Sequence, residues 1–270
     1  MSDRSEGMNT VSGSQTVRRA MEILRLVACG QELGVRLTDI VRMSGMNRPT
    51  VHRILKTLIE ENAVEQDADT RRYLIGPELS LLGIARTRRF PIMSTAETYL
   101  AQLAQQVGDT VFLSIRHGHD SICIGRRTGH HPIQVLSIEV GSRRPLGVGV
   151  SGVALLSTLS HDEVERITQA NASRLELHRL PGEELRERVE LARQLGYAYV
   201  AAGVMPGTSA VAIPVIALDG QPLAAVTITA MAERLSRERL PQVVRQMREQ
   251  AALISQHHEA VFQAERPHQA

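Results

Sequence analysis

Aromatic residues and long apolar runs are scarce in this sequence. It has no Trp, three Phe and four Tyr among 270 residues, although 43% of its residues are hydrophobic. Its cores must therefore be built mainly from aliphatic side chains. No apolar run approaches the roughly 20 residues that a membrane-spanning helix needs, and the polar first residues do not resemble a signal peptide. These absences predict a cytoplasmic protein without a membrane partner.

Cysteine is also scarce, and neither sign of charge dominates. Cys29 and Cys123 each lie in an apolar stretch, which predicts a reducing compartment and no disulfide framework. The net charge is +2, but residues 1–89 contain fourteen basic and eleven acidic side chains, whereas the rest of the chain contains seventeen and eighteen. A basic N-terminal part beside a near-neutral body is typical of a nucleic-acid-binding domain joined to a sensing domain. The length also favours two domains.

Residues 37–59 have the pattern of two helices joined by a tight turn. Thr38 is a suitable N-cap for the first helix, and Gly45 provides the left-handed residue that would end it. Asn47 can cap the second helix, where Pro49 falls in the first turn and its missing N–H costs nothing. The pattern predicts a helix-turn-helix.

The second of these helices is predicted to have one apolar face and one basic, hydrogen-bonding face. The apolar face comprises Val51, Ile54, Leu55, Leu58 and Ile59. The candidate DNA contacts are Arg48, Pro49, Thr50, His52, Arg53, Lys56 and Thr57, with Arg36 and Thr38 at the start of the preceding helix. Such a face fits a DNA major groove. The alternative is an ordinary helical hairpin with a solvated charged face.

Residues 64–76 favour the DNA-binding interpretation. Val64–Gln66 and Arg72–Ile75 are predicted to form a hairpin around the turn at residues 67–70. A hairpin directly behind a recognition helix is the wing of a winged helix. Arg71 and Arg72 would lie near its tip, where they could contact phosphates.

The remaining sequence predicts a linker helix and an α/β body. The linker has an apolar stripe that needs a cover, and a second copy of the protein is one candidate. The body is predicted to contain helices at 92–107, 152–159, 162–170, 182–195 and 237–261, and strands at 111–115, 121–124, 133–138, 197–200, 210–218 and 223–229.

The predicted fold class is α+β, with a winged helix-turn-helix, a linker helix and a GAF-like ligand-sensing domain built on an antiparallel sheet. The expected boundaries are a disordered tail at 1–14, the DNA-binding domain at 15–76 with its helix-turn-helix at 37–56, the linker at 77–90, the effector-binding domain at 91–262 and a tail at 263–270.

Taken in order, these features resemble the IclR family of bacterial transcriptional regulators. The resemblance spans residues 16–262 and rests on the segments TVRRAMEILRLV, LTDIVRMSGMNRPTVHRIL, RRYLIGPELSLLG, RPLGVGVSGVALLS, LGYAYV and SAVAIPVIALDGQPLAAVTIT. It implies a regulator that binds a double-stranded DNA operator as a dimer or a dimer of dimers, responds to a small organic acid or aromatic catabolite, and needs no cofactor. A repressor is favoured over an activator.

The resemblance also implies where an effector would bind. The aligned positions are Val150, Ser151, Val200, Ala210, Thr227 and Thr229, with Ile133 and Leu136 as an apolar wall. Val200 and Ala210 stand where glyoxylate-sensing members have an acidic residue and a cysteine. The pocket is therefore expected to be less polar and to suit a larger or more apolar ligand, whose identity stays open.

Two other motifs around residues 147–153 have simpler explanations than the sites they resemble. Residues 147–152 form a literal G-x-G-x-x-G, but Arg143-Arg144-Pro145 precedes it in place of a recognisable strand, and no ribose-binding acid follows at the required distance. The loop is expected instead to direct backbone amides toward the pocket. Ser151 resembles half of a nucleophile elbow, but Val153 replaces the last glycine.

The sequence supports metal binding and catalysis much less than it supports DNA binding. The residues that could suggest zinc lack a strong ligand spacing and are expected to be solvated turn residues. They are His117, His119, Cys123, His130 and His131. An enzyme fused to a DNA-binding domain and a constitutive architectural DNA-binding protein remain as alternative functions. The sequence predicts neither a metal nor a catalytic residue.

Overall fold

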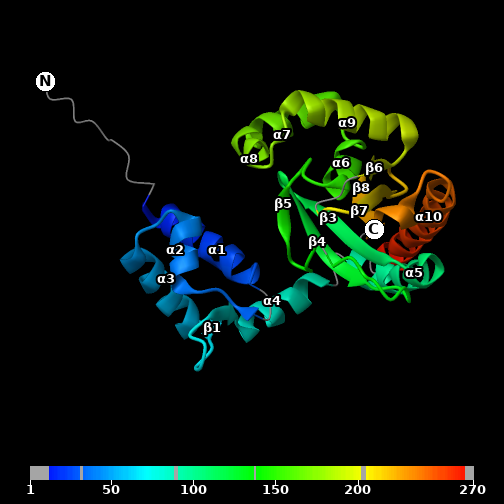
Figure 1. Cartoon of the computed structure of the whole chain (residues 1–270). Helices are drawn as coiled ribbons and strands as arrows, with labels where there is room; N and C mark the ends of the chain where they lie inside the picture. The colour runs from blue at the N-terminus through cyan, green and yellow to red at the C-terminus, as the bar shows by residue number, and fades with distance from the viewer. Residues whose placement is uncertain (1–11, 31–32, 88–90, 137, 202–204, 265–270) are drawn as a thin grey trace, which may run out of the picture. The chain divides into compact units, whose positions relative to one another are not determined.

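A computed structural model describes residues 12–30, 33–87, 91–136, 138–201 and 205–264. The chain divides into two compact units, Met1–Thr87 and Arg88–Ala270, each of which is described separately (Figure 1). Among the helices within these ranges, none is both long and apolar enough to cross a membrane.

The first unit is a three-helix core with a two-stranded wing. Its elements are α1 (Ser12–Ala28), α2 (Leu37–Ser44), α3 (Arg48–Glu60), β1 (Val64–Gln66), β2 (Tyr73–Ile75) and α4 (Pro77–Thr87). Strands β1 and β2 pair in antiparallel fashion, and an isolated bridge joins Val35 to Tyr73. The aliphatic core lies between α1, α2 and α3, with Val51 and Leu55 of α3 fully buried.

Two predictions for this unit were wrong in detail. Residues 12–14, assigned to the tail, begin α1. Thr38 is not the N-cap of α2, because the helix starts at Leu37 and the N-cap position belongs to Arg36. Arg36 has the extended backbone of an N-cap and follows Val35, whose bridge to Tyr73 keeps the chain strand-like until that point. Thr38 instead lies exposed in the first turn.

The second unit is an antiparallel sheet with helices on both faces. Its strands are β3 (Thr110–His117), β4 (Asp120–Arg127), β5 (Arg143–Pro145), β6 (Ala198–Val200), β7 (Thr208–Ile216) and β8 (Pro222–Met231). Its helices are α5 (Ile92–Val107), α6 (Val150–Leu156), α7 (His161–Ala170), α8 (Ala172–Leu177), α9 (Gly182–Leu195), a 3-10 turn (Ala232–Leu235) and α10 (Leu240–Ala264). The strand order is β5-β4-β3-β8-β7-β6. The α+β prediction is therefore confirmed.

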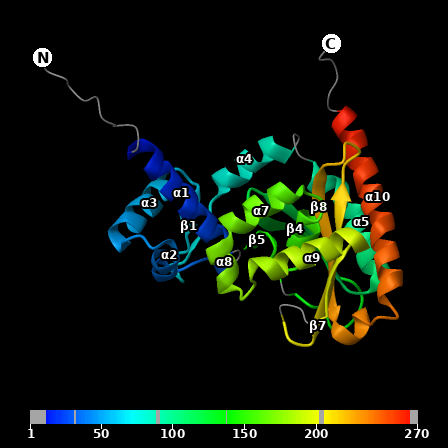
Figure 2. The same ribbon diagram turned by 90° about the horizontal axis from the view of Figure 1, so that it is seen from above.

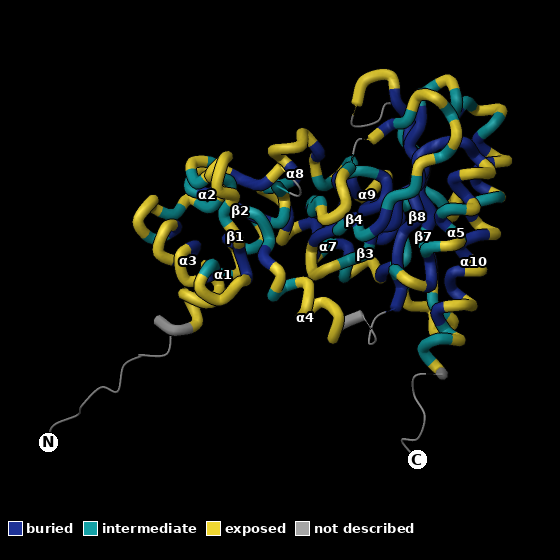
Figure 3. The backbone as a smooth tube through the Cα atoms, turned by 90° about the horizontal axis from the view of Figure 1, so that it is seen from below, coloured by how far each residue is buried: buried dark blue, intermediate teal, exposed yellow. Residues whose placement is uncertain are grey.

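The two faces of this sheet have separate cores. Helices α5 and α10 lie side by side on one face, and α6 to α9 lie over the other (Figures 1 and 2). Because successive strand residues point to opposite faces, β7 sends Val211 and Ile213 toward α5 and α10, and Ala210 and Ala212 toward α6. The central strands are buried on both sides, and the solvent-facing turns of the helices are exposed (Figure 3).

The strand predicted at 133–138 was wrong over the part of it that the structure describes. Residues 133–136 form an irregular segment, and the edge strand is β5, which pairs with β4. The Ile133 backbone N–H bonds to the imidazole of His131 rather than to a strand. A short apolar run between turns does not by itself distinguish a strand from an ordered loop.

Candidate DNA interface and effector site

The turn before α3 fixes the direction of the recognition helix. Gly45 has a φ of 66°, the left-handed conformation that ends α2. The Asn47 side chain then accepts a hydrogen bond of 2.9 Å from the Thr50 amide and caps α3. Both features match the sequence prediction. Together with the buried apolar face of α3, they leave its other face pointing outward.

The outward face of α3 carries the predicted groove contacts. Arg48, Pro49, His52, Arg53, Lys56 and Thr57 are exposed, and Thr50 is half-buried. The Thr57 hydroxyl donates to the Arg53 carbonyl at 3.3 Å, so its proton is used within the helix. Lys56 lies 3.9 Å from Glu60, and both side chains remain mostly exposed. At such an exposed pair the attraction is weak, so Lys56 stays available to DNA.

A hydrogen-bonded turn shapes the tip of the wing. The Asp67 carboxylate accepts bonds from the Thr70 amide at 2.7 Å and the Thr70 hydroxyl at 2.6 Å. The hydroxyl bond is the main cause that lowers the pKa of Asp67. The Gln66 side chain donates to the Arg71 carbonyl at 3.0 Å, and Arg71 has a positive φ of 57°. The Arg71 side chain is left exposed beside this turn.

Arg72 occupies a different environment from Arg71. It is half-buried, and its Nη1 donates to the carbonyls of Leu33 at 3.3 Å and Gly34 at 3.1 Å. These carbonyls belong to the connection between α1 and α2. The structure therefore does not bring the two predicted phosphate contacts together, because Arg72 fastens the wing to that connection.

The predicted effector residues of the sheet lie on its α6-facing side in two cross-strand rows. Antiparallel partners point to the same side of a sheet. The register therefore defines a Thr229 row, made of Val200, Ala210, Thr229 and Thr110. It also defines a Thr227 row, made of Ala198, Ala212, Thr227 and Phe112. The sequence prediction missed Thr110 and Phe112, although the alternation Thr110-x-Phe112 would have placed them on one face.

The Thr227 hydroxyl is an unusual feature of these rows. Its side chain is 2% exposed, and among the residues that the structure describes no group hydrogen-bonds to its Oγ1. Its row neighbours are Ala212 and Phe112, which offer only apolar side chains. An unsatisfied buried hydroxyl costs about 1–3 kcal/mol unless a water or a ligand completes it. Thr227 therefore marks a point where a polar group of a ligand would be stabilised.

Val150 and Ser151, the first two residues of α6, lie on the same side of the sheet. Both residues are buried, and Val150 belongs to one apolar cluster with Ala210 and Val200. Two glycines, Gly147 before α6 and Gly152 within it, allow close packing. A side chain at Gly147 would begin 2.6 Å from the Leu185 side chain, and one at Gly152 would begin 2.7 Å from the Gly147 nitrogen.

A short strand does precede the glycine-rich loop at residues 147–152, contrary to the prediction. Strand β5 ends at Pro145, but it is the antiparallel edge strand of the sheet. A dinucleotide fold needs this loop to follow the first strand of a parallel β-α-β unit. The topology therefore argues against nucleotide binding more strongly than the sequence did.

The predicted apolar wall is less enclosed than the two rows. Ile133 is 56% exposed and Leu136 is 48% exposed, in the irregular segment 133–136. This segment is joined to the Thr229 row through Gln134, which the sequence prediction did not single out. The structure thus groups six of the predicted effector residues on one face and places the other two at its margin.

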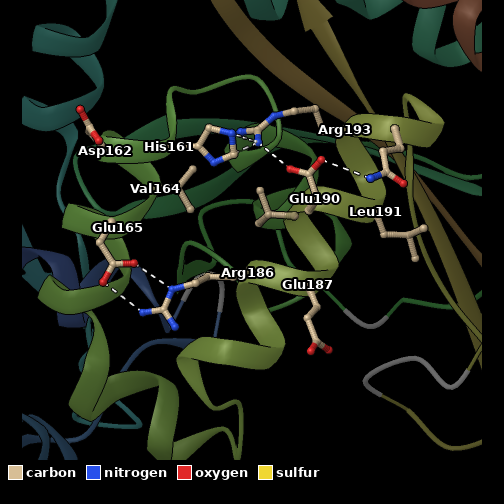
Figure 4. Close-up of a pocket in the computed structure, with 11 residues that line it drawn as sticks. His161, Asp162, Val164, Glu165, Arg186, Glu187, Glu190, Leu191 and Arg193 are labelled. Atoms are coloured by element: carbon tan, nitrogen blue, oxygen red, sulfur yellow. Dashed lines mark hydrogen bonds and ion pairs between the residues drawn. The ribbon is translucent and has the colours of Figure 1, made fainter.

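A surface hollow of about 770 Å³ lies between α7 and α9, away from these rows (Figure 4). Both arginines that line it are already paired with acidic side chains of the same hollow. Arg186 donates to both carboxylate oxygens of Glu165 at 2.8 and 3.0 Å, and these bonds lower the pKa of Glu165. Arg193 bonds to Glu190 at 2.9 Å and to the Leu159 carbonyl at 2.8 Å. The two arginines are therefore less available to an anionic effector.

The residues that could suggest zinc are not gathered into a site. Within the described ranges, no three His, Cys, Asp or Glu side chains are close enough together to bind a metal ion. His117 accepts a hydrogen bond from Arg143 at 3.1 Å, which requires its Nδ1 to be unprotonated because a guanidinium can only donate.

Comparisons with known proteins agree with this geometry. Residues 84–256 match the family described as bacterial transcriptional regulator IclR C-terminal, and residues 16–68 match the IclR helix-turn-helix domain. The glycerol operon regulatory protein of Streptomyces coelicolor is 30% identical over 252 residues, which cover 89% of this chain and 95% of that protein. The HTH-type transcriptional repressor AllR of Salmonella paratyphi A is 28% identical over 232 residues, covering 84% of each chain. The solved structure of an IclR transcriptional regulator from Alicyclobacillus acidocaldarius has a TM-score of 0.71 and 25% identity, covering 90% of this chain and 98% of that one.

Proposed function

The chain belongs to the IclR family of bacterial transcriptional regulators, and from this premise we propose that it is a repressor whose operator affinity is switched by a small organic acid or aromatic catabolite. Members of this family are DNA-binding transcriptional regulators. They are not enzymes, so the family does not support the alternative of an enzyme fused to a DNA-binding domain. The repressor assignment is supported by the names of two relatives, the repressor AllR and the transcriptional repressor IclR of Escherichia coli.

We propose that the outward face of α3 reads bases and that Arg71 contacts a phosphate. The observation that carries this proposal is the exposed cationic face of a helix whose other face is fully packed. Arg48, His52 and Arg53 can donate to base edges in a major groove, and Arg53 can bind a guanine with two hydrogen bonds. Arg71 at the wing tip can add a sequence-independent contact.

The groove proposal is tested with Arg53→Ala. Loss of a base contact should cost about 1–3 kcal/mol of operator binding and relax the preference at one position of the site. Gel-shift titrations against the region upstream of its own gene, with single-base variants of the bound site, measure both effects. Arg188→Ala on α9, which removes an exposed arginine outside this face, is the control. Equal affinities for the two variants on every sequence would contradict the assignment of Arg53.

We propose that the effector binds on the α6-facing side of the sheet, between the two rows and the start of α6 at Val150 and Ser151. The unpartnered Thr227 hydroxyl is the observation that supports this site most directly. The surrounding side chains are mainly Ala and Val, so the ligand would have an apolar body and a polar end. Organic acids and aromatic catabolites fit that description.

Thr227→Val tests the effector site, because it replaces the hydroxyl by a methyl group of similar size. The variant should keep the operator affinity of the protein without effector and should weaken the response to any compound that binds. Benzoate, phenylacetate, pyruvate and glyoxylate form a first panel for thermal-shift titration, since a ligand of the folded state raises the melting temperature. A compound that acts on the wild type should then be tested in gel shifts.

Thr168→Val is the matched control. Its hydroxyl is also buried, but it donates to the Val164 carbonyl at 2.8 Å, so the variant should lose stability and keep the effector response. An unchanged dose response in Thr227→Val would remove that residue from the site. Operator binding beside a melting temperature that ignores every compound would favour a constitutive architectural DNA-binding protein.

We also propose that the protein acts as a homodimer or a dimer of dimers. Helix α4 supports this, because Leu81, Leu82 and Ile84 are 61%, 58% and 66% exposed. Paired recognition helices would read half-sites about one helical turn, roughly 34 Å, apart. A coupling of about 1–3 kcal/mol between effector and operator binding is enough for a usable switch. Sedimentation of the wild type and of Leu82→Glu tests the assembly.

A further inference from the structure

The Thr229 row ends at a buried hydroxyl that is bonded to a loop. Thr110 is fully buried and is the β3 partner of Thr229 in the register. Its Oγ1 lies 2.7 Å from Oε1 of Gln134. Gln134 lies in the irregular segment 133–136, outside the sheet. The pair therefore joins the proposed effector row to a segment that is not part of any strand.

The roles of the two groups follow from the other bonds of Gln134. Its Nε2 donates to the Gly108 carbonyl at 3.0 Å and to the His131 carbonyl at 2.6 Å. Only the amide nitrogen of a glutamine can donate to a carbonyl, so these bonds leave Oε1 facing Thr110. Thr110 must then be the donor. Every polar atom of the Gln134 side chain is thus used to hold the segment against the start of β3.

The two residues of the proposed apolar wall lie on either side of this attachment. Ile133 and Leu136 are exposed, whereas Val135 between them is 5% exposed. A backbone hydrogen bond of 2.9 Å, donated by the His131 amide to the Gly108 carbonyl, also holds the chain just before this segment. Gln134 is therefore the side chain that ties the wall-bearing residues to the end of the Thr229 row.

We propose that Thr110 and Gln134 form a latch that holds the Ile133–Leu136 wall beside the end of the Thr229 row and so sets the affinity for effectors with an apolar body. The inference rests on the proposed effector site. Both are positioning residues, since each acts through the wall rather than on the ligand. The latch predicts selectivity among ligands: an effector with an aromatic ring depends on the wall, whereas a two-carbon acid does not reach it.

The experiment compares Thr110→Val, Thr110→Ser, Gln134→Leu and the wild-type full chain. Benzoate is the probe with an apolar body, and glyoxylate is the probe without one. Loss of one hydrogen bond that positions the wall should weaken benzoate binding about tenfold. Thr110→Val and Gln134→Leu should both show this loss, and Thr110→Ser, which keeps the donor, should bind benzoate like the wild type. Glyoxylate should bind Gln134→Leu, whose substitution lies outside the sheet, as tightly as it binds the wild type.

Amide hydrogen exchange provides a readout that does not depend on a ligand. Exchange within residues 131–136 should accelerate in Thr110→Val and Gln134→Leu and should return to the wild-type rate in Thr110→Ser. If Thr110→Val fails to fold, Gln134→Leu tests the same bond from the less buried side.

The outcomes separate the latch from the effector site on which it rests. If benzoate binds the wild type and Thr227→Val weakens it, but neither latch variant does, the latch is wrong and the site stands. Equal weakening of benzoate and glyoxylate by the latch variants would also overturn the proposal, because it would indicate general damage to the sheet. If Thr227→Val has no effect, or neither probe binds the wild type, the proposed site fails and the latch fails with it.

Discussion

Cys29 and Cys123 have opposite surroundings. Cys29 is exposed, whereas Cys123 on β4 is 3% exposed and its Sγ donates to the Gly125 carbonyl at 3.5 Å. Burial raises the pKa of the Cys123 thiol from its usual 9.0 to about 11. The thiolate is the reactive form of cysteine, so Cys123 should be inert at neutral pH.

At the residue scale, we therefore predict that iodoacetamide at pH 7.5 modifies Cys29 and leaves Cys123 unmodified until the protein unfolds. Because the pKa of Cys123 is higher in the folded state, the unfolded state loses the thiol proton at a lower pH than the folded state does. Stability should consequently fall as the pH rises from about 9 to about 11. Mass spectrometry of labelled wild type and Cys29→Ser measures the rates. Equal labelling rates for the two thiols in the folded protein would contradict the prediction.

At the scale of elements, the wing divides its two arginines between separate tasks. Arg71 is exposed at the hydrogen-bonded tip, and Arg72 is bonded to the Leu33 and Gly34 carbonyls. A guanidinium that donates to backbone carbonyls fixes one element against another. The wing is therefore attached to the connection that leads into α2.

We predict that Arg71→Ala and Arg72→Ala have different effects. Arg71→Ala should reduce the slope of log affinity against log salt by about one, because one phosphate contact is lost. Arg72→Ala should leave that slope unchanged and lower the stability of the first unit by about 1 kcal/mol. Gel shifts across a salt series and thermal unfolding measure the two quantities. A reduced salt slope in Arg72→Ala would show that Arg72 also contacts DNA.

The elements differ in how far the sequence could predict them. The helix-turn-helix was predictable because Asn47, Pro49 and Gly45 act within a few residues of their own position. The start of α2 was not, because Arg36 becomes the N-cap only through the bridge between Val35 and Tyr73, which joins distant parts of the chain.

On the proposed effector face, too, the sequence predicted the features that depend on neighbouring residues and missed those that depend on distant ones. The alternation of Thr227 and Thr229 placed them correctly on one face of β8. The irregular path of residues 133–136 depends on Gln134 bonding to Gly108 and Thr110, 26 and 24 positions away. Periodicity within a short window contains no information about such bonds.

At the scale of the whole molecule, each unit has a core of its own. The first unit buries Ile23 and Leu55, and the second buries its own aliphatic side chains on both faces of the sheet. The second unit also contains a buried ionic group. Asp109 is bonded to Arg234 at 2.6 Å and to Arg239 at 3.0 Å, and both arginines also donate to the Val107 carbonyl.

We predict two thermal transitions that respond to different substitutions. Asn47→Ala removes the cap of α3, so it should lower the free energy of unfolding of the first unit by about 1 kcal/mol and shift only that unit's transition to a lower temperature. Asp109→Asn leaves two arginines without their carboxylate. It should lower the free energy of unfolding of the second unit by about 3 kcal/mol and shift only that unit's transition to a lower temperature. Calorimetry of both variants and the wild type tests this assignment. A single transition that both variants shift would show that the units unfold together.

The two-residue period of β7 has a consequence for changing what this protein responds to. Its odd-numbered residues Val211, Ile213 and Val215 fill the core against α5 and α10, whereas Ala210 and Ala212 face α6. The packing against α5 and α10 and the proposed effector contacts therefore occupy alternate positions of one strand. A biosensor library restricted to Ala198, Val200, Ala210 and Ala212 would reshape the α6 side while leaving the packing against α5 and α10 intact. The same separation gives natural selection a way to retune the response without losing the fold.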